Sequence, residues 1–160
     1  MSDVVSPEDR SRMMAGIRGK DTKPELIIRK GLHPLGFRYR LHDRKLPGKP
    51  DLCFPKYRAV ILVNGCFWHG HDCHLFKWPS TRDGFWKKKI TSNRERDQKN
   101  VVALEELGWR VLVIWECALK GITRHDPGYV IREIEQWLKT GHYYRVIEGK
   151  KTDNKKTTCS

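Results

Sequence analysis

The sequence predicts an α/β fold in which a mixed central sheet is flanked by helices. Residues 51–54 and 58–63 have the pattern of two strands joined by a tight turn, which makes an antiparallel hairpin. Residues 83–107 then have the pattern of a helix, and residues 109–115 that of a buried strand. A strand, a helix and a strand in this order form a right-handed crossover whose strands run parallel. One antiparallel pair and one parallel pair make the sheet mixed.

Composition limits the class of protein. A chain of 160 residues can bury one substantial core. With 32 Lys and Arg against 19 Asp and Glu, the net charge of +13 favours a polyanionic partner, nucleic acid before membrane. The alternative is a basic surface without a specific partner, but six tryptophans offer rings on which bases can stack. No apolar run is long enough to cross a bilayer, and the polar N-terminus is not a secretory signal.

Residues 1–20 predict a basic N-terminal arm. Ser6 and Pro7 mark the start of a helix, and Met14 and Ile17 belong to a thin apolar stripe among arginines and lysines. Two interpretations remain open. The arm packs on the domain, or it lies on DNA and directs apolar side chains at a groove.

A second helix is expected after Asp21, ending near Gly36. Thr22 and Glu25 have the spacing of a capping box, in which each side chain bonds the backbone N–H of the other residue. Glu25 therefore has a structural explanation, against which a catalytic role must be weighed. A strand follows over residues 37–41.

Asp51 begins the predicted hairpin. If the hairpin turns near residue 56, Asp51 lies opposite Leu62 and Val63, at the mouth of the loop formed by residues 64–76. A carboxylate in this place can hold a divalent cation beside His69.

The loop of residues 64–76 is rich in cysteine and histidine. Because the chain has five cysteines and no export signal, metal binding or free thiols are favoured over disulfides. Cys66, His71 and Cys73 suit Zn²⁺, and Cys117 follows the strand that runs parallel to the one before the loop. Cys117 thus reaches the same sheet edge and completes a tetrahedral structural zinc site. The other candidates for the fourth ligand are Cys53, His69, His74 and Cys159.

His69 is left unused if His71 binds zinc. A neutral imidazole beside a cation held by Asp51 is a suitable general base for a water that attacks a phosphodiester. Mg²⁺ is a hard cation that takes oxygen ligands, and it is the ion expected there. The alternative is that His69 is only a structural neighbour of the zinc.

The long helix over residues 83–107 aligns Trp86, Asn93 and Asp97 on one stripe. Its N-terminal half, with Lys89 close by, can extend past the core towards a ligand. Asp97 is at a core-facing position, where an unpaired carboxylate is unfavourable, so it needs a cation or an arginine as partner.

Over residues 8–140 the chain resembles the very-short-patch-repair (Vsr) mismatch endonucleases. The motifs that carry this resemblance are Thr22-x-x-Glu25, Leu46-Pro47-Gly48-x-Pro50-Asp51, Gly65-Cys66-Phe67-Trp68-His69-x-His71-x-Cys73, the segment Lys89 to Asp97, Gly108-Trp109-Arg110-Val111 and Trp115-Glu116-Cys117. The resemblance implies a restriction-endonuclease-like fold. We expect a DNA-binding arm at 1–20, an endonuclease domain at 21–141 and a disordered basic tail at 142–160.

The resemblance also implies an activity. The implied activity is that of a Mg²⁺-dependent enzyme that nicks double-stranded DNA on the 5′ side of the T in a T·G mismatch. Such mismatches arise when 5-methylcytosine deaminates, and the nick initiates short-patch repair. We expect a monomer with no membrane partner, in the bacterial cytoplasm and associated with the nucleoid. Mismatch-repair proteins are further candidate partners.

The resemblance assigns roles to individual residues. Asp51 and the backbone carbonyl of Val63 match the magnesium ligands, His69 matches the general base, and Glu25 and Asp97 would act through metal-bound waters. The residues that match the zinc ligands are Cys66, His71, Cys73 and Cys117. Those that match DNA contacts are the wedge aromatics Phe67, Trp68 and Trp86, the mismatch contacts Lys89 and Asn93, and the minor-groove residues Met14 and Ile17. A wobble pair is easier to unstack than a Watson–Crick pair, so a wedge helps to select it.

One position departs from the family pattern. Asn64 stands where better-known members have histidine, and an amide can orient a water or phosphate but cannot carry a proton. Two other functions remain open, a zinc-stabilised DNA-binding module without catalysis and a nuclease with a different duplex target. Asp51 and His69 argue against the first, because a pure binder has no use for them.

Overall fold

The computed structural model describes residues 22–151. The predicted arm with Met14 and Ile17, and the far tail with Cys159, lie outside the described residues. The elements are α2 (Lys23–Leu32), β1 (Arg40–Leu41), β2 (Leu52–Phe54), β3 (Ala59–Asn64), α3 (Asp83–Glu106), β4 (Arg110–Trp115), α4 (Pro127–Thr140) and β5 (Tyr144–Ile147), with short 3₁₀ helices at His33–Leu35, Pro55–Tyr57 and Glu116–Ala118. Among residues 22–151, none of the helices combines the length and apolar character needed to cross a membrane.

The described strands form one sheet in the order β1-β2-β3-β4-β5. β1, β2 and β3 pair antiparallel, whereas β3, β4 and β5 pair parallel. The predicted mixed sheet is therefore confirmed, and so is the parallel pairing of the strands on either side of α3. The hairpin register pairs Leu52 with Ile61, so Asp51 lies across from Leu62 as expected.

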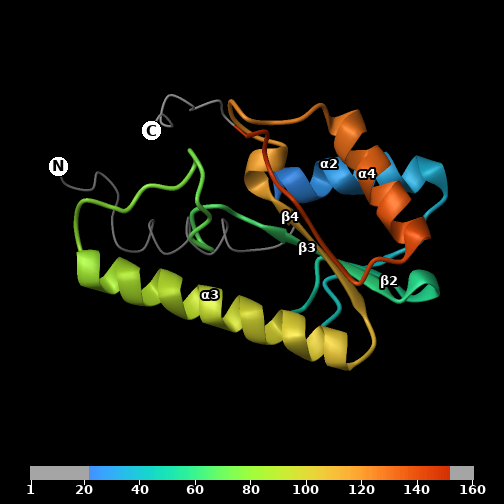
Figure 1. The fold of residues 1–160 in the computed structure, drawn as a ribbon, viewed down its shortest axis with the longest axis horizontal. Helices are drawn as coiled ribbons and strands as arrows, with labels where there is room; N and C mark the ends of the chain where they lie inside the picture. The colour runs from blue at the N-terminus through green and yellow to red at the C-terminus, as the bar shows by residue number, and fades with distance from the viewer. Residues whose placement is uncertain (1–21, 152–160) are drawn as a thin grey trace, which may run out of the picture.

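Helices cover both faces of the sheet (Figure 1). α2 and α4 pack on one face, in a core that includes Ile28, Trp137 and Leu112, all fully buried. α3 packs on the other face through Leu104, against Val111 and its neighbours. Successive residues of β4 point to opposite cores, which explains why this strand is continuously apolar.

α3 has the predicted extent and the predicted buried stripe. Its buried residues are Ile90, Asn93 and Leu104, spaced so that they share one face. Gly108 follows with a φ of +90°, a conformation that a residue with a Cβ adopts only with strain, and this ends the helix before β4.

Two predicted boundaries need correction. The strand expected over residues 37–41 is reduced to β1, Arg40–Leu41. The tail expected over residues 142–160 starts too early, because Tyr144–Ile147 form β5 and pair with β4. This stretch exposes Tyr144 and Val146, so its sequence lacks a clean apolar pattern, and the parallel pairing with β4 orders it.

Arg110 of β4 forms hydrogen bonds to the C-terminal end of α4. Its guanidinium donates to the carbonyl oxygens of Tyr57, Trp137 and Leu138 at 3.0–3.1 Å and lies 4.8 Å from the centre of the Trp137 ring. Carbonyl oxygens in the last turn of a helix lack partners within the helix, and Arg110 supplies donors to two of them in α4, Trp137 and Leu138. Burial also lowers the pKa of Arg110.

We expect Arg110→Met to lower the free energy of unfolding by about 3 kcal/mol, because three carbonyls lose a charged, partly buried donor. Urea unfolding of the metal-loaded protein measures this loss. Arg124→Met is the matched control, since the exposed Arg124 guanidinium contacts only the Gly121 carbonyl among the hydrogen bonds described. Equal losses in the two variants would contradict the role given to Arg110.

Candidate active site and metal centre

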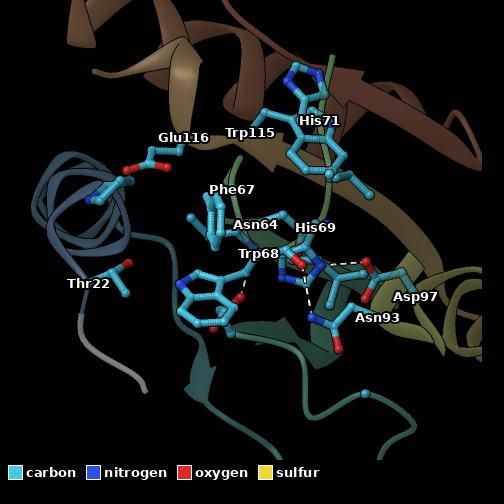
Figure 2. Close-up of a pocket in the computed structure, with 18 of the residues that line it drawn as sticks. Thr22, Asn64, Phe67, Trp68, His69, His71, Asn93, Asp97, Trp115 and Glu116 are labelled. Atoms are coloured by element: carbon cyan, nitrogen blue, oxygen red, sulfur yellow. Dashed lines mark hydrogen bonds and ion pairs between the residues drawn. The ribbon is translucent and has the colours of Figure 1, made fainter. Parts of the chain in front are cut away.

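A groove of about 2110 Å³ opens at the carboxyl ends of β3 and β4. Its walls come from the start of α2, the loop before Asp51, the 64–72 segment and α3, and Figure 2 shows part of this lining. The described lining residues include eight Lys and Arg but four Asp and Glu. The groove is therefore suited to a polyanion, in keeping with the net charge.

Four of the predicted ligands meet at one edge of this groove. One ligand atom from each of Cys66, His71, Cys73 and Cys117 lies within 4.8 Å of the others. His71 Nδ1 is 3.6 Å from the sulfur atoms of both Cys66 and Cys117. The parallel β3–β4 pairing brings Cys117 here from 51 residues away along the chain, as the topology predicts.

The other candidates for the fourth ligand position lie elsewhere. Cys53 is buried in β2 and packs on the α3 side of the sheet. His69 pairs with Asp97. His74 lies beside Gly121, and Cys159 is beyond the described residues.

The cluster has the hydrogen bonds that thiolate ligands require. Backbone amides donate to the sulfurs of Cys66, Cys73 and Cys117 at 3.3–3.4 Å. The hydrogen bond from Cys66 lowers the pKa of Cys117 to about 5, while the pKa of Cys66 itself is raised. A lowered pKa favours the thiolate form of Cys117, which is the form that binds a divalent cation.

His71 is oriented by two neighbours that the sequence did not reveal. Its Nε2 lies 2.8 Å from the Glu148 carboxylate, so Nδ1 is the nitrogen directed at the sulfurs. The Trp115 ring stacks on the imidazole at 4.1 Å between ring centres. A carboxylate on the second nitrogen is the usual arrangement for a metal-binding histidine. Only the β5 pairing brings Glu148 here, so no local signal could have identified it.

Asp51 lies at the hairpin mouth, where it was expected. Its Oδ2 accepts a hydrogen bond of 2.7 Å from the backbone N–H of Val63, so the described contact uses the amide of Val63 and not its carbonyl. The pKa of Asp51 is raised to about 6, mainly by burial; the Val63 hydrogen bond opposes this rise, and the charge of Glu25 adds to it. A cation would relieve this repulsion, so the residues fit a divalent ion.

Glu25 is buried in the same place, at 1% exposure. Its Oε2 lies 3.1 Å from Arg29 Nη1 and 2.8 Å from His42 Nε2. Among the described residues the Thr22 side chain makes no capping hydrogen bond, so the capping box is not the explanation of Glu25. Glu25, His42 and Asp51 each place a donor atom within 4.8 Å of the others.

His42 is a site residue that the sequence analysis missed. Leu41 pairs with Leu52 in the antiparallel β1–β2 ladder. His42, which follows Leu41, therefore lies opposite Asp51, which precedes Leu52. The His42 amide donates to the Asp51 carbonyl at 3.1 Å. The available signal was the position of His42, directly after β1, the strand that pairs with β2 just after Asp51.

His69 and Asp97 point towards one another across the groove, joined by a hydrogen bond between Nδ1 and Oδ2 (Figure 2). The expected partner of Asp97 was a cation or an arginine, and the structure corrects this. Asp97 instead fixes the ring of His69, which leaves the Nε2 lone pair to act as a base. His69 also lowers the pKa of Asp51 through its charge, so the two residues are close. Asn64 is the last residue of β3 and pairs with Trp115 of β4. It lines the groove together with His69, Asp97 and Asp51.

The aromatic residues expected to contact DNA pack on one another. Ring centres of Phe67, Trp68 and Trp86 are 5.2–5.8 Å apart, and Trp68 is 7% exposed. Asn93 is buried and donates to the Trp68 carbonyl at 2.9 Å, so it holds this loop, while Lys89 lines the groove. The sequence analysis did not single out three neighbours that extend the cluster: Phe76, Trp78 and Phe85.

Comparison with known proteins finds close relatives. A family profile described as "DNA mismatch endonuclease Vsr" matches residues 2–75. DNA mismatch endonuclease Vsr of Escherichia coli (strain K12) is 44% identical over 138 residues, 86% of this chain and 88% of that protein. Type II nicking enzyme V.XorIIP of Xanthomonas oryzae pv. oryzae is 48% identical over 122 residues, 76% of this chain and 90% of that protein. Type II nicking enzyme V.NmeAIP of Neisseria meningitidis serogroup A is 44% identical over 137 residues, 84% and 98% of the two chains.

Proposed function

The chain belongs to the family of Vsr DNA mismatch endonucleases, and from this premise we propose that it nicks one strand of double-stranded DNA, 5′ of the T in a T·G mismatch. The reaction is Mg²⁺-dependent phosphodiester hydrolysis, and it initiates short-patch repair. The observation that carries the proposal is that Asp51 and the His69–Asp97 pair line one basic groove, with the buried Glu25 beside Asp51. A DNA-binding module without catalysis has no need of this arrangement.

The residues present fit two metals of different chemistry. Three thiols and an imidazole with hydrogen-bonded sulfurs suit Zn²⁺, held by Cys66, His71, Cys73 and Cys117. Asp51, with the carbonyl of Val63, is the proposed holder of Mg²⁺. When bound, Mg²⁺ supplies positive charge that stabilises the charge developing on the phosphate.

His69 is the proposed general base, positioned by Asp97. Asp97 accepts from the Nδ1–H of His69, so Nε2 takes the proton of the attacking water while the water oxygen bonds to phosphorus. The bond from phosphorus to one sugar oxygen breaks in the same displacement, and that oxygen leaves and takes a proton from solvent. The negative carboxylate also stabilises the imidazolium that forms. Asn64 has no proton to exchange, so its proposed role is to orient water or phosphate.

Recognition of the mismatch is assigned to the aromatic cluster and its surroundings. We assign Phe67, Trp68 and Trp86 to a wedge, Lys89 and Asn93 to contacts at the mismatched pair, and Met14 and Ile17 to the minor groove. Because these aromatics pack together in the free protein, insertion requires the cluster to open when DNA binds. The domain plan of an arm at 1–20 and an endonuclease domain with a restriction-endonuclease-like fold belongs to the same proposal, with the domain extended to include β5.

The deciding experiment is a nicking assay with the metal-loaded protein. A T·G duplex, the matched T·A and C·G duplexes and other mismatches are compared in one sequence context, with Mg²⁺ and with EDTA. We expect cleavage of one strand next to the T of T·G, and only with Mg²⁺. Binding without nicking would favour the non-catalytic module, and equal cleavage of T·A would favour a nuclease with another target.

We expect His69→Gln to lower the single-turnover nicking rate by about 10²–10⁴-fold, the usual contribution of a general base. Asp97→Asn should lower the rate less, by about 10–10²-fold, because an amide holds the ring but stabilises no positive charge. The double variant should be little worse than His69→Gln, since Asp97 acts through His69. Additive losses would show that Asp97 has a separate task.

A further inference from the structure

His42 is the site residue to which the proposed function gives no task. Its Nε2 atom is buried and, among the described residues, has no aligned hydrogen-bond partner, although Glu25 Oε2 is 2.8 Å away. A buried nitrogen that lies this close to a carboxylate oxygen without hydrogen-bond alignment gains little from the contact, so its position needs another explanation. His69, the other imidazole near Asp51, is already occupied by Asp97.

The position of His42 is fixed by the backbone. The β1–β2 register sets it opposite Asp51, and its amide is bonded to the Asp51 carbonyl. Its φ of +48° is an uncommon conformation for histidine, and it occurs directly after β1 ends at Leu41. Nε2 thereby comes within 4.0 Å of Asp51 Oδ1, the oxygen that does not accept from Val63.

The distances match those between ligands of one metal ion. Around an octahedral ion with bonds of about 2.1 Å, adjacent ligand atoms are about 3.0 Å apart and opposite ones about 4.2 Å apart. The His42–Glu25 distance of 2.8 Å resembles the first spacing, and the His42–Asp51 distance of 4.0 Å resembles the second. All three donor atoms lie within 4.8 Å of one another.

We propose that His42 is a direct nitrogen ligand of the divalent cation at Asp51, with Glu25 as the third protein donor. The proposal rests on the proposed function, because it concerns the same cation. It adds a selectivity: an imidazole ligand strengthens binding of first-row transition ions relative to Mg²⁺, which prefers oxygen. The site then accepts Mn²⁺ more tightly than a site with oxygen ligands alone.

Mn²⁺ added to the zinc-loaded protein is the probe. It stands at the weak end of the transition-ion series and does not displace zinc from thiolates. We expect pulsed electron paramagnetic resonance to show coupling of bound Mn²⁺ to a histidine nitrogen. His42→Gln should remove this coupling and lower Mn²⁺ affinity by about tenfold or more, with a smaller effect on Mg²⁺ affinity.

Two variants identify the source of the nitrogen. His33→Gln, at an exposed histidine after α2, should keep the coupling, and so should His69→Gln. If the coupling persists in His42→Gln, or disappears in His69→Gln, the proposal is overturned while the Asp51 cation site stands. If wild-type protein binds neither Mn²⁺ nor Mg²⁺, the proposed metal-dependent function fails as well, so the two failures are distinguishable.

Discussion

Replacing Asp51 by Asn is expected to lower the nicking rate on a T·G duplex by at least about 10³-fold, because the metal contributes several kcal/mol of charge stabilisation. Asparagine has the same shape, and its oxygen can still accept the 2.7 Å hydrogen bond from Val63 N–H. The change therefore removes charge and leaves the hairpin mouth in place. Single-turnover nicking with saturating protein measures the chemical step, and fluorescence anisotropy measures binding of the same duplex.

DNA binding by Asp51→Asn should be equal to that of the wild type or slightly tighter, since one negative charge leaves a basic groove. Asp43→Asn is the matched control. The Asp43 carboxylate accepts from the Lys45 amide in the loop before Asp51, and this substitution removes the same charge outside the groove lining. Nicking by Asp51→Asn at near the wild-type rate would rule Asp51 out as the metal ligand. Joint loss of nicking and binding would give Asp51 a structural role instead.

The parts of the site that follow from strand pairing were predictable. The hairpin register places Asp51 opposite Leu62, and parallel β3 and β4 end at one edge, so Cys117 meets the cysteines of the loop. Both inferences need only the number of residues between turns and the rule that crossover strands are parallel. They hold because the core fixes the register of buried strands.

The parts that depend on weak or distant pairing were not predictable. β1 has two residues, too few to show a periodic pattern, so the sequence did not reveal that His42 faces Asp51. Glu148 reaches His71 through β5, whose exposed tyrosine hides the strand pattern. Asp97 presented a further ambiguity, because an inward-facing carboxylate accepts a cation, an arginine or a histidine equally well.

Cys117→Ala is expected to release the zinc and to destabilise the groove as a whole. Cys117 joins β4 to the 64–76 loop through the shared cluster, and its sulfur also accepts from the Gly149 amide just after β5. At a zinc concentration about 1,000 times the dissociation constant, loss of the bound ion removes about 4 kcal/mol of stability. Chelator release under reducing conditions should find about one zinc per wild-type chain and none in the variant. Urea unfolding gives the change in stability.

Cys53→Ala separates loss of the metal from loss of a buried sulfur. Cys53 is as deeply buried as Cys117, at 1% exposure, but it packs in the core beside Val60 and not in the cluster. It should keep its zinc and lose only about 1 kcal/mol through the cavity left behind. Because His69 lies between Cys66 and His71, release of the zinc should also free the base from its place beside Asp97. Cys117→Ala should therefore lose nicking even at temperatures where the sheet stays folded, whereas retained nicking would show that the metal does not position the base.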